Sequence, residues 1–450
     1  MMTNKAIKIA TIGSGSGYTP ELVQGFLDRY DDMPVKELWL VDVEAGKEKL
    51  ETIGAMAKRM VAAAGRPMKI VTTLDREAAL KDADFVTTQF RVGQLPARVN
   101  DENIPIKYGL VGQETNGAGE LMMALRSIPV LISIVHDMER LCPNAWLINF
   151  ANPAGMMTEA VTHYTNWTKV IGLCNGPDNI VKDILKALDA DRKRVYTEFI
   201  GLNHLVFAKH IYLDGQDVTR HVIDLVTNHT ERVDNPGVGD WNDDFLQSLG
   251  AVPISYLQYY WKTRQVVKAE EYAASHEGSR AVVAEKLEKQ LFAIYRNPEL
   301  TTVPPELKKR GGSGYSQASC NLIYSLYSDR GDVQTVNVVN NGGCLDLAPD
   351  SVMEMNCVIT GHGPVPLTVG HLPSGAAGIV HEMKAFEQVG CKAAVTGDYG
   401  TTLKALTLNP LVHSDVDART LLNDLLKANE QYLPQFDFKQ LRAEGKVWND

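Results

Sequence analysis

A short apolar run ends in a cysteine and an asparagine in front of a Gly-Pro pair. Residues 170–173 read V-I-G-L and lead into Cys174-Asn175-Gly176-Pro177, and His204 ends a later motif, Gly-Leu-Asn-His. A thiolate and an imidazole together suit a soft-to-borderline divalent metal, and two protein ligands leave coordination positions open for substrate oxygens. The same spacing also fits a buried structural cysteine and a hydrogen-bonded core histidine. The two residues alone leave both interpretations open.

A glycine-rich turn lies near the N-terminus, between an apolar run and a helical pattern. It reads Gly13-Ser14-Gly15-Ser16-Gly17-Tyr18, and Asp42 ends the next apolar run. Glycines let the backbone approach a pyrophosphate, the following helix offers free N–H groups, and an acid after the second strand can hold ribose hydroxyls. The strict G-x-G-x-x-G pattern needs glycine at position 18, so the match is partial. We predict that Gly13, Gly15, Gly17, Tyr18 and Asp42 bind a dinucleotide; the alternative is a glycine-rich turn without a nucleotide.

Further polar side chains follow apolar runs in the first third of the chain. Arg98 lies in L-P-A-R-V-N-D-E-N-I-P, Glu114 in Q-E-T-N-G, and Asn152 follows the run Ala145–Phe150. In an open α/β sheet, ligands bind beyond the carboxyl ends of the strands. These residues can meet Cys174 there, or they can be solvated loop charges and a turn-forming asparagine.

An aromatic stretch, Tyr256-Leu257-Gln258-Tyr259-Tyr260-Trp261, has helical spacing. The aromatic residues at its end favour packing of a helix against the core. Tyr256, at its start, can instead reach a cleft. A phenol has an ordinary pKa of about 10, so Tyr256 acts as a base only beside a cation or metal.

Strands that alternate with helices have to position these residues. Thr19-Pro20 is a typical helix start, and a further long helix is expected over Gly119–Leu141. The predicted strands are Ile7–Ile12, Glu37–Val43, Lys69–Thr73, Asp84–Phe90, Ala145–Phe150 and Lys169–Cys174. This alternation predicts an α/β fold with a Rossmann-like, doubly wound parallel sheet.

The pattern changes after about residue 190. Strands of a different sheet are expected over Tyr196–Ile200 and Leu205–Tyr212, a largely helical segment over Tyr256–Ile294, and mostly helix in the last seventy residues. We predict a nucleotide-binding domain over 1–190 and an α+β domain for substrate, metal and oligomerisation over 191–450. The stretch Asn228–Gly250 is the best candidate for a mobile loop.

Composition narrows the possible functions. The chain has 450 residues and a formal net charge of −10, which argues against a nucleic-acid partner. Its six cysteines are scattered without a C-x-x-C pair, as in reduced cytosolic proteins. The N-terminus lacks the long apolar segment of a signal peptide, and the best apolar run, Ile128–Val135, is too short to span a membrane. We therefore expect a cytoplasmic protein.

Several multi-residue motifs, taken together in order, resemble glycoside hydrolase family 4, the NAD-dependent glycosidases. The resemblance covers residues from about 6 to about 430, and the glycine-rich turn that ends in an aromatic residue and Thr-Pro is typical of that family. The motifs are RVGQLPARVNDENIPIKYGLVGQETNGAGE, LINFANPAG, GLCNGP, GLNH, SYLQYYW and NVVNNGG. The resemblance implies a second domain like the C-terminal domain of lactate and malate dehydrogenases, and a homodimer or homotetramer.

The resemblance also implies an unusual mechanism, an exception to two-carboxylate hydrolysis. NAD+ takes hydride from C3 of the sugar, and the resulting ketone acidifies the proton on C2. A base removes that proton and the aglycone leaves C1; water then adds, and the hydride returns to C3. A divalent metal, usually manganese, holds the C2 and C3 oxygens and stabilises the enediolate.

Residue by residue, the resemblance implies that Cys174 and His204 bind the metal and that Tyr256 is the C2 base. Glu114 matches a residue thought to raise the basicity of that tyrosine. The implied substrate contacts are Arg98, Asn152, Asn175 and Arg280.

The residue after the cysteine indicates substrate class, because Cys-Asn-x-Pro is typical of members that cleave 6-phospho-β-glucosides. Members with Cys-Asp tend to act on 6-phospho-α-glucosides, and that aspartate protonates the leaving group. Asn175 cannot do so. The resulting prediction is hydrolysis of phosphorylated β-glucosides such as cellobiose 6-phosphate.

Three alternatives remain from the sequence. One is another glycosidase of the same family, acting on 6-phospho-α-glucosides or on α-galactosides. Another is an NAD-dependent 2-hydroxy-acid dehydrogenase, which would release NADH stoichiometrically and would have no role for a Cys–His metal pair. A non-catalytic, nucleotide-responsive binding protein is the last.

Overall fold

The computed structural model describes residues 5–227, 241–310 and 314–448. Its N-terminal part is a parallel sheet in the order β3-β2-β1-β4-β5-β6, which confirms the predicted Rossmann-like, doubly wound fold. The strands are β1 (Ile7–Ile12), β2 (Val35–Val41), β3 (Lys69–Thr73), β4 (Phe85–Thr88), β5 (Trp146–Asn149) and β6 (Val170–Gly172). The predicted strands are therefore present, with ends that differ by a few residues.

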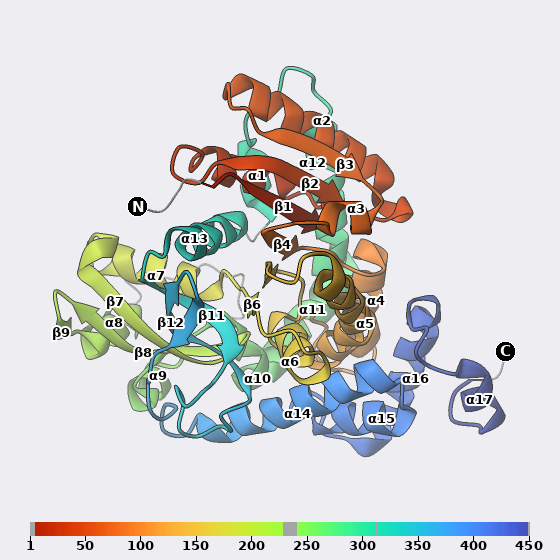
Figure 1. Ribbon diagram of the computed structural model, residues 1–450. Coiled ribbons are helices and arrows are strands. Elements are labelled where there is room, and N and C mark those ends of the chain that lie inside the picture. Colours follow the sequence, from red (N-terminus) through yellow and green to blue (C-terminus); the bar gives the residue numbers. More distant parts are fainter. Residues whose placement is uncertain (1–4, 228–240, 311–313, 449–450) are drawn as a thin grey trace.

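Helices cover both faces of this sheet, so that its central strands are buried (Figure 1). Buried parallel strands are nearly continuous apolar or β-branched runs, as Ile7–Ile12 is apart from Lys8, because neither face meets water. The helices of the N-terminal part are α1 (Thr19–Leu27), α2 (Lys47–Ala63), α3 (Arg76–Leu80), α4 (Gln94–Ile106), α5 (Gly117–Leu141), α6 (Ala154–Tyr164) and α7 (Gly176–Ala187).

Helix α4 was not predicted, because its sequence contains two prolines and many polar residues. Gly93, with φ of 80°, precedes the helix, Pro96 falls in its first turn and Pro105 in its last. A proline in the first turn removes no intrahelical hydrogen bond, and one near the end disrupts little. Arg98, which we expected after a strand in an irregular segment, is therefore held on a helix.

The strands after residue 190 extend the same sheet, so the expectation of a different sheet is wrong. Strand β11 pairs with β6 through Asn337 and Gly172, and the order continues β11-β12-β7-β8-β10. The close approach needs glycine, since a Cβ at 172 would lie 2.9 Å from the Cβ of Asn337. The strands are β7 (Val195–Leu202), β8 (Leu205–Leu213), β9 (Gln216–Asp217), β10 (Val252–Pro253), β11 (Asp332–Val339), β12 (Val352–Thr360) and β13 (Gly363–Pro366).

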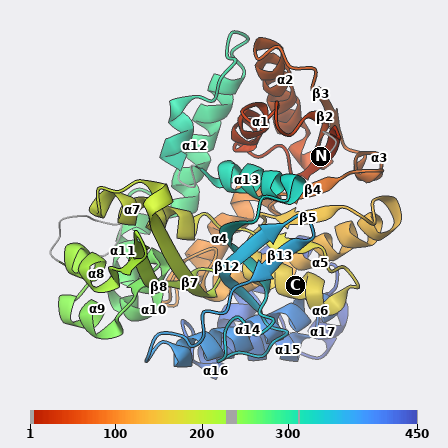
Figure 2. The ribbon, with the colours of Figure 1, turned by 60° about the vertical axis from the view of Figure 1, so that its left-hand side comes forward.

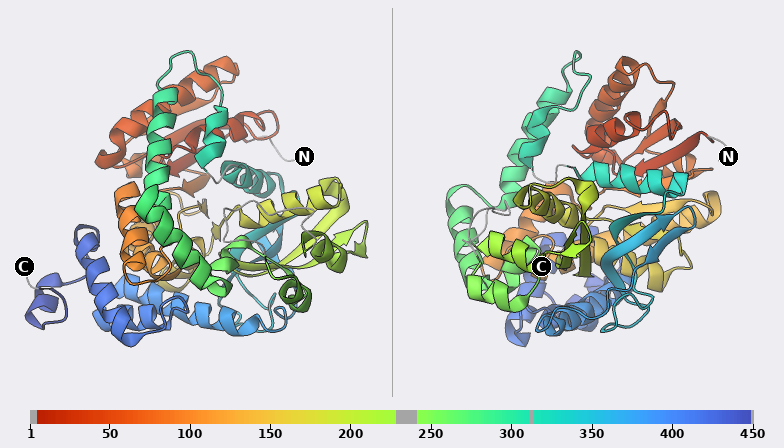
Figure 3. Two further views of the ribbon diagram at one scale, coloured as in Figure 1. Left: turned by 180° about the vertical axis from the view of Figure 1, so that it is seen from behind. Right: turned by 90° about the vertical axis from the view of Figure 1, so that its left-hand side faces the viewer.

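Helices from the second half of the chain pack on the first half. Figure 3 shows α12 rising from the end of α11 to lie beside α2, and α13 packs on α1. The helices are α8 (Thr219–Thr227), α9 (Asp243–Leu249), α10 (Gln258–Trp261), α11 (Thr263–His276), α12 (Arg280–Tyr295), α13 (Tyr315–Ser328), α14 (Ala377–Thr396), α15 (Tyr399–Leu408), α16 (Asp415–Asn429) and α17 (Phe438–Ala443). Within Asn228–Gly250, residues 228–240 lie outside the described residues, and most of the remainder forms α9.

Helix α5 is the candidate membrane span among the described residues. Its length and composition would suffice to cross a bilayer, which our reading of the sequence did not anticipate. However, 78% of its most apolar 18-residue window is buried within the protein. It is therefore a core helix, packed between α4, α6 and α14.

Candidate functional site

A single cleft of about 1930 Å³ collects nearly all of the predicted site residues. It runs from the glycine-rich turn, past the carboxyl ends of the parallel strands, to the segment around α11 and α12. The predicted residues that line it are Gly13, Gly15, Tyr18, Asp42, Arg98, Glu114, Asn152, Cys174, Asn175, His204, Tyr256 and Arg280. The structure therefore places the predicted cofactor, metal, base and substrate residues in one continuous space.

The glycine-rich turn and Asp42 form one end of the cleft. Gly13 has φ of 86°, and a Cβ there would lie 2.6 Å from backbone atoms of Phe90. Gly15 donates its backbone N–H to Asp42 Oδ2 at 2.6 Å, and Val43 donates to Oδ1 at 2.8 Å. Burial raises the pKa of the Asp42 carboxyl, against the effect of these two donors. The backbone of the turn therefore lies too close to its neighbours for a side chain at Gly13 or Gly15.

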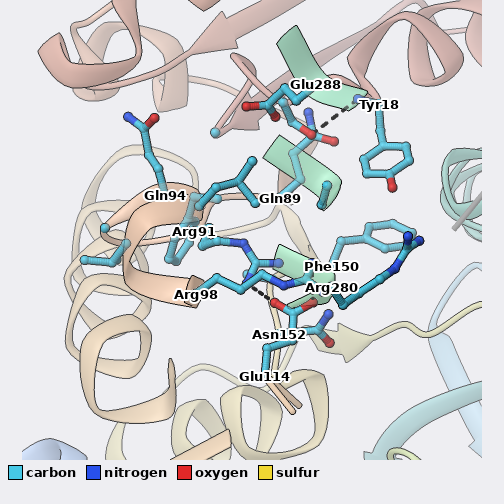
Figure 4. Close-up of a pocket in the computed structure, with 18 of the residues that line it drawn as sticks. Tyr18, Gln89, Arg91, Gln94, Arg98, Glu114, Phe150, Asn152, Arg280 and Glu288 are labelled. Atoms are coloured by element: carbon cyan, nitrogen blue, oxygen red, sulfur yellow. Dashed lines mark hydrogen bonds and ion pairs between the residues drawn. The ribbon is translucent and has the colours of Figure 1, made fainter. Parts of the chain in front are cut away.

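Tyr18 faces the cleft, whereas Gly17 is part of the packing behind it. The Tyr18 side chain lines the cleft at the start of α1, whereas Gly17 is not among the lining residues that the structure describes. The Gly17 carbonyl instead accepts a hydrogen bond from the Tyr295 hydroxyl at 2.7 Å. Figure 4 shows Tyr18 and Glu288 at the same end of the cleft.

The metal-ligand candidates come from two different strand ends. Cys174 follows β6, and its sulfur accepts a hydrogen bond from the Gly176 N–H at 3.4 Å. His204 lies in the two-residue turn between β7 and β8 with φ of 60°, an uncommon conformation that is typical of functional sites. Gly201, before it, must be glycine, because a Cβ would lie 2.2 Å from the Leu205 carbonyl oxygen.

The hydrogen bond of His204 fixes its tautomer. The Thr115 carbonyl accepts a bond from Nδ1 at 3.4 Å, so Nδ1 carries the proton and Nε2 keeps its lone pair. Burial lowers the pKa of His204 to about 4, which keeps the imidazole neutral. Burial raises the pKa of the Cys174 thiol above its ordinary value. A neutral imidazole and a buried thiol are a donor set that a divalent cation can bind once the thiol loses its proton.

Tyr256 stacks directly on His204. The two rings are 4.2 Å apart at their centroids and inclined by 11°. Burial, and then the nearby Cys174, Tyr259 and Glu114, raise the pKa of the Tyr256 phenol, whereas Arg98 acts in the opposite direction. Cys174, His204 and Tyr256 therefore lie together, as the sequence reading required.

Two arginines surround Glu114 next to this group (Figure 4). Arg98 Nη1 lies 2.8 Å from Glu114 Oε1, and Arg91 is ion-paired with the other carboxylate oxygen. Arg98 Nε also donates to Glu102 at 2.7 Å. Burial alone would raise the pKa of Glu114, but Arg91 and Arg98 together hold it below its ordinary value. Arg91 was missed in the sequence, although it stands in the motif R-V-G-Q-L-P-A-R.

Two asparagines of the cleft carry polar atoms without a protein partner. Asn152 Oδ1 and Asn175 Nδ2 are buried and make no hydrogen bond to the described residues. Buried polar atoms are normally satisfied, so such atoms in a cleft point to a bound ligand. Arg280, the first residue of α12, also lines the cleft.

A lysine at the cofactor end was also missed. Lys49 of α2 lines the cleft and pairs with Glu288 of α12 at 2.6 Å. Its position within an ordinary amphipathic helix gave no signal in the sequence.

Comparison with known proteins identifies the family. The models for "Family 4 glycosyl hydrolase" and "Family 4 glycosyl hydrolase C-terminal domain" match residues 8–190 and 199–412. A "Probable 6-phospho-beta-glucosidase" of Bacillus subtilis (strain 168) is 53% identical over 441 residues, which cover 98% of this chain and 100% of that protein. The "6-phospho-beta-glucosidase" of Escherichia coli (strain K12) is 45% identical over 440 residues, 96% and 97% of the two chains.

Solved structures agree with these relatives. The 6-phospho-β-glucosidase of Thermotoga maritima, solved with manganese, NAD+ and glucose-6-phosphate, has a TM-score of 0.87 and 36% identity, covering 95% of this chain and 99% of that one. A lactate dehydrogenase of Eimeria maxima has a TM-score of 0.53 at 16% identity, over 88% and 97% of the chains, and shares the fold alone. The chain belongs to family 4 of the glycosyl hydrolases and is a glycosidase, as its motifs predicted.

Proposed function

We propose that this enzyme hydrolyses 6-phospho-β-glucosides, such as cellobiose 6-phosphate, with the help of NAD+ and a divalent metal, most simply Mn2+. The observation that carries the proposal is the convergence of Cys174, His204 and Tyr256 in the same cleft as the glycine-rich turn. The substrate class is supported by relatives named 6-phospho-β-glucosidase at 53% and 45% identity over nearly the whole chain.

The residues at the glycine-rich end fit a dinucleotide. Gly13 and Gly15 leave no room for side chains, so a pyrophosphate can approach the backbone at the start of α1. NAD+, when bound, would supply a reversible hydride acceptor for the sugar. The role of this chain's residues is to hold the cofactor, with Tyr18 and Asp42 beside it, and to place the sugar against it.

The residues at the strand ends fit a divalent metal. Cys174 and His204 are 5% and 2% exposed, and His204 presents Nε2 with a free lone pair. Within the described ranges, no group of three or more His, Cys, Asp or Glu side chains could hold a metal ion. Two protein ligands suit a site whose other positions are taken by sugar oxygens, where the metal would act as a Lewis acid.

Tyr256 is the residue placed to accept the C2 proton. In the protein without ligands its pKa is raised by burial, so the phenol holds its proton. A cation bound beside the stacked His204 would lower that pKa, together with Arg98. Glu114 offsets the charge of Arg98, so it keeps the phenolate basic enough to take a proton from carbon.

The two unpartnered asparagine atoms are placed to bind sugar hydroxyls. Asn152 Oδ1 can accept and Asn175 Nδ2 can donate a hydrogen bond, and Arg280, at the start of α12, provides a cation in the same cleft. Asn175 carries no acidic proton, so the proton for the leaving aglycone comes from another group or from water.

The organisation of the chain remains part of the proposal. We keep the division into a cofactor domain, 1–190, and a substrate, metal and oligomerisation domain, 191–450, because the parallel strands end with β6 and its helix α7 closes at Ala187. A homodimer or homotetramer is proposed on the family resemblance alone, and light scattering would test it.

A substrate panel tests the reaction. We expect the enzyme to cleave p-nitrophenyl β-glucoside 6-phosphate but not its α-anomer or the unphosphorylated β-glucoside. The reaction should require NAD+ and should form no net NADH. Preferential cleavage of the α-anomer, or stoichiometric NADH, would overturn the proposal.

Replacing the base separates chemistry from binding. Tyr256→Phe removes the phenol oxygen while keeping the ring that stacks on His204. We expect turnover to disappear, with NAD+ and Mn2+ binding unchanged by calorimetry. A variant that retains turnover would rule out Tyr256 as the base.

A further inference from the structure

A buried carboxyl group lies behind the Cys174–His204 pair and has no part in the mechanism above. It belongs to Glu354 on β12 and is fully buried, with an exposed fraction of 0%. A buried carboxyl is costly unless its neighbours satisfy it. Its position in the sheet indicates what it does.

Glu354 occupies one row that crosses four neighbouring strands. The row runs from Gly172 on β6 to Asn337 on β11, then to Glu354 on β12 and Gly201 on β7. Figure 2 shows β12 beside β7 and β8 in this part of the sheet. One end of the row lies two residues before Cys174, and the other end lies three residues before His204. The row therefore connects the two strands that carry the proposed metal ligands.

The contacts of Glu354 are made by two amides. Asn337 Nδ2 donates to Glu354 Oε1 at 2.9 Å, and Asn203 Nδ2 donates to the same oxygen at 3.4 Å. The other oxygen, Oε2, has no hydrogen-bond partner among the described residues. Glu354 is thus tied to the row on one side and to the β7–β8 turn on the other.

Asn203 brings this network to both ligand positions. It directly precedes His204, and its Oδ1 accepts a hydrogen bond from the Gly155 N–H at 3.4 Å. Burial raises the pKa of the Cys174 thiol, and the nearby Asn203 side chain acts in the opposite direction. One amide therefore joins the turn that holds the imidazole to the start of α6 and lies near the thiol. Outer partners of this kind fix the orientation of metal ligands.

We propose that Glu354 and Asn203 are positioning residues for the divalent metal: Glu354, anchored by Asn337, holds the Asn203 amide, which in turn orients the Cys174 sulfur and the His204 turn. This inference rests on the proposed metal site. It goes beyond that site because it assigns the metal affinity partly to residues outside the cleft, in the β7–β8 turn and on strand β12.

The test is metal binding by the full-length enzyme, not turnover. Mn2+ is titrated by calorimetry, and Co2+ binding is followed by its thiolate charge-transfer absorption. The variants are Asn203→Ala, Glu354→Leu, their double variant, and Glu354→Gln, which keeps an oxygen that accepts from both amides. Asn203 is not among the residues with positive φ, so alanine fits its backbone. NAD+ affinity is measured for every variant as a check on folding.

A matched control is Asn340→Ala. Asn340 is also fully buried and follows β11, but its amide bonds the carbonyls of Cys344 and Leu347, away from the metal-ligand candidates. It loses a comparable set of hydrogen bonds without touching the proposed network.

We expect Asn203→Ala and Glu354→Leu each to weaken Mn2+ binding by about 10–100-fold and to weaken the Co2+–thiolate absorption. The double variant should have the same Mn2+ affinity as whichever single variant binds Mn2+ more weakly, because the two residues act through one contact. Glu354→Gln and Asn340→Ala should bind Mn2+ like the wild type, and NAD+ affinity should not change.

Three results overturn the inference while leaving the metal site intact. One is wild-type Mn2+ affinity in Asn203→Ala and in Glu354→Leu; another is an equal loss in Asn340→Ala, which would reveal general destabilisation. Loss of NAD+ binding together with Mn2+ binding in both variants would overturn it for the same reason. A wild-type enzyme that binds no Mn2+ would instead overturn the proposed metal site itself, and this inference with it.

Discussion

Glu114→Gln removes one charge from a buried group of ions while keeping its shape. Glu114 and its partners Arg91 and Arg98 are 11%, 26% and 13% exposed at their side chains, and Arg98 keeps a second carboxylate, Glu102, at 2.7 Å. The loss therefore falls mainly on Arg91, which is left partly buried without this carboxylate.

The magnitude follows from that burial. Removing one partner of a fully buried ion pair costs about 3–5 kcal/mol. Because Arg91 is about a quarter exposed and Arg98 retains Glu102, we discount this to about 2–3 kcal/mol at about pH 7. The pH dependence of this stabilisation follows from the lowered pKa of Glu114. The Glu114 carboxylate stabilises the folded protein above its ordinary pKa of 4.5, and this stabilisation is lost as the pH falls through the lower pKa of the folded protein.

The assay compares denaturation midpoints of the wild type and Glu114→Gln at about pH 7 and in acid. We expect a difference of about 2–3 kcal/mol near neutrality that shrinks as the pH falls. The control is Glu77→Gln, which breaks an exposed pair with Arg140 and should leave the midpoint unchanged. A Glu114→Gln midpoint equal to that of the wild type, or a difference that persists in acid, would refute the reasoning.

Three further changes test other parts of the structure. Gly13→Ala adds a Cβ that would lie 2.6 Å from backbone atoms of Phe90, at a residue whose φ is 86°. Titration with NAD+ should therefore give a Kd at least about tenfold higher than that of the wild type. An unchanged Kd would contradict the role of the turn in NAD+ binding. Lys384→Met removes a buried ammonium that pairs with two buried carboxylates, Glu159 at 3.0 Å and Glu387. It should lower the unfolding free energy by about 3–5 kcal/mol in denaturant titrations; an unchanged value would show that these pairs contribute nothing. Burial lowers the pKa of His204 to about 4 and raises the pKa of Cys174. Mn2+ binding at about pH 7 should therefore release one proton, which comes from the thiol. Calorimetry in buffers of different ionisation enthalpy measures this number, and it would show two released protons if His204 were also protonated.

The parallel half of the fold was predictable because its strands bury both faces. A strand such as Ile7–Ile12 is then a short run of apolar and β-branched residues, broken only by Lys8, ahead of a helical pattern. Strand β12 was missed for the opposite reason: it reads V-M-E-M-N-C-V-I-T, and its buried Glu354 and Asn356 look like surface residues. Their burial depends on amide partners from other strands, which a local pattern does not contain.

The metal and base residues of the site were predictable only through the resemblance. Nothing in the spacing of Cys174 and His204 shows that β6 and β7 come together, because β11 and β12 lie between them in the sheet. The pairing of Arg98 with Glu114 depends on α4, a helix whose prolines argue against it in the sequence. Sequence motifs therefore named the residues proposed to react, whereas the groups that hold them required the three-dimensional arrangement.

Helix α12 begins in the cleft and ends at the glycine-rich turn. Arg280 starts it in the cleft, and Tyr295 ends it with a hydrogen bond to the Gly17 carbonyl. At 1.5 Å per residue, its 16 residues form a rod of about 24 Å. Any displacement of the glycine-rich turn on dinucleotide binding would therefore be carried along this stiff helix to Arg280. We expect the enzyme to bind its two ligands in a preferred sequence, cofactor first.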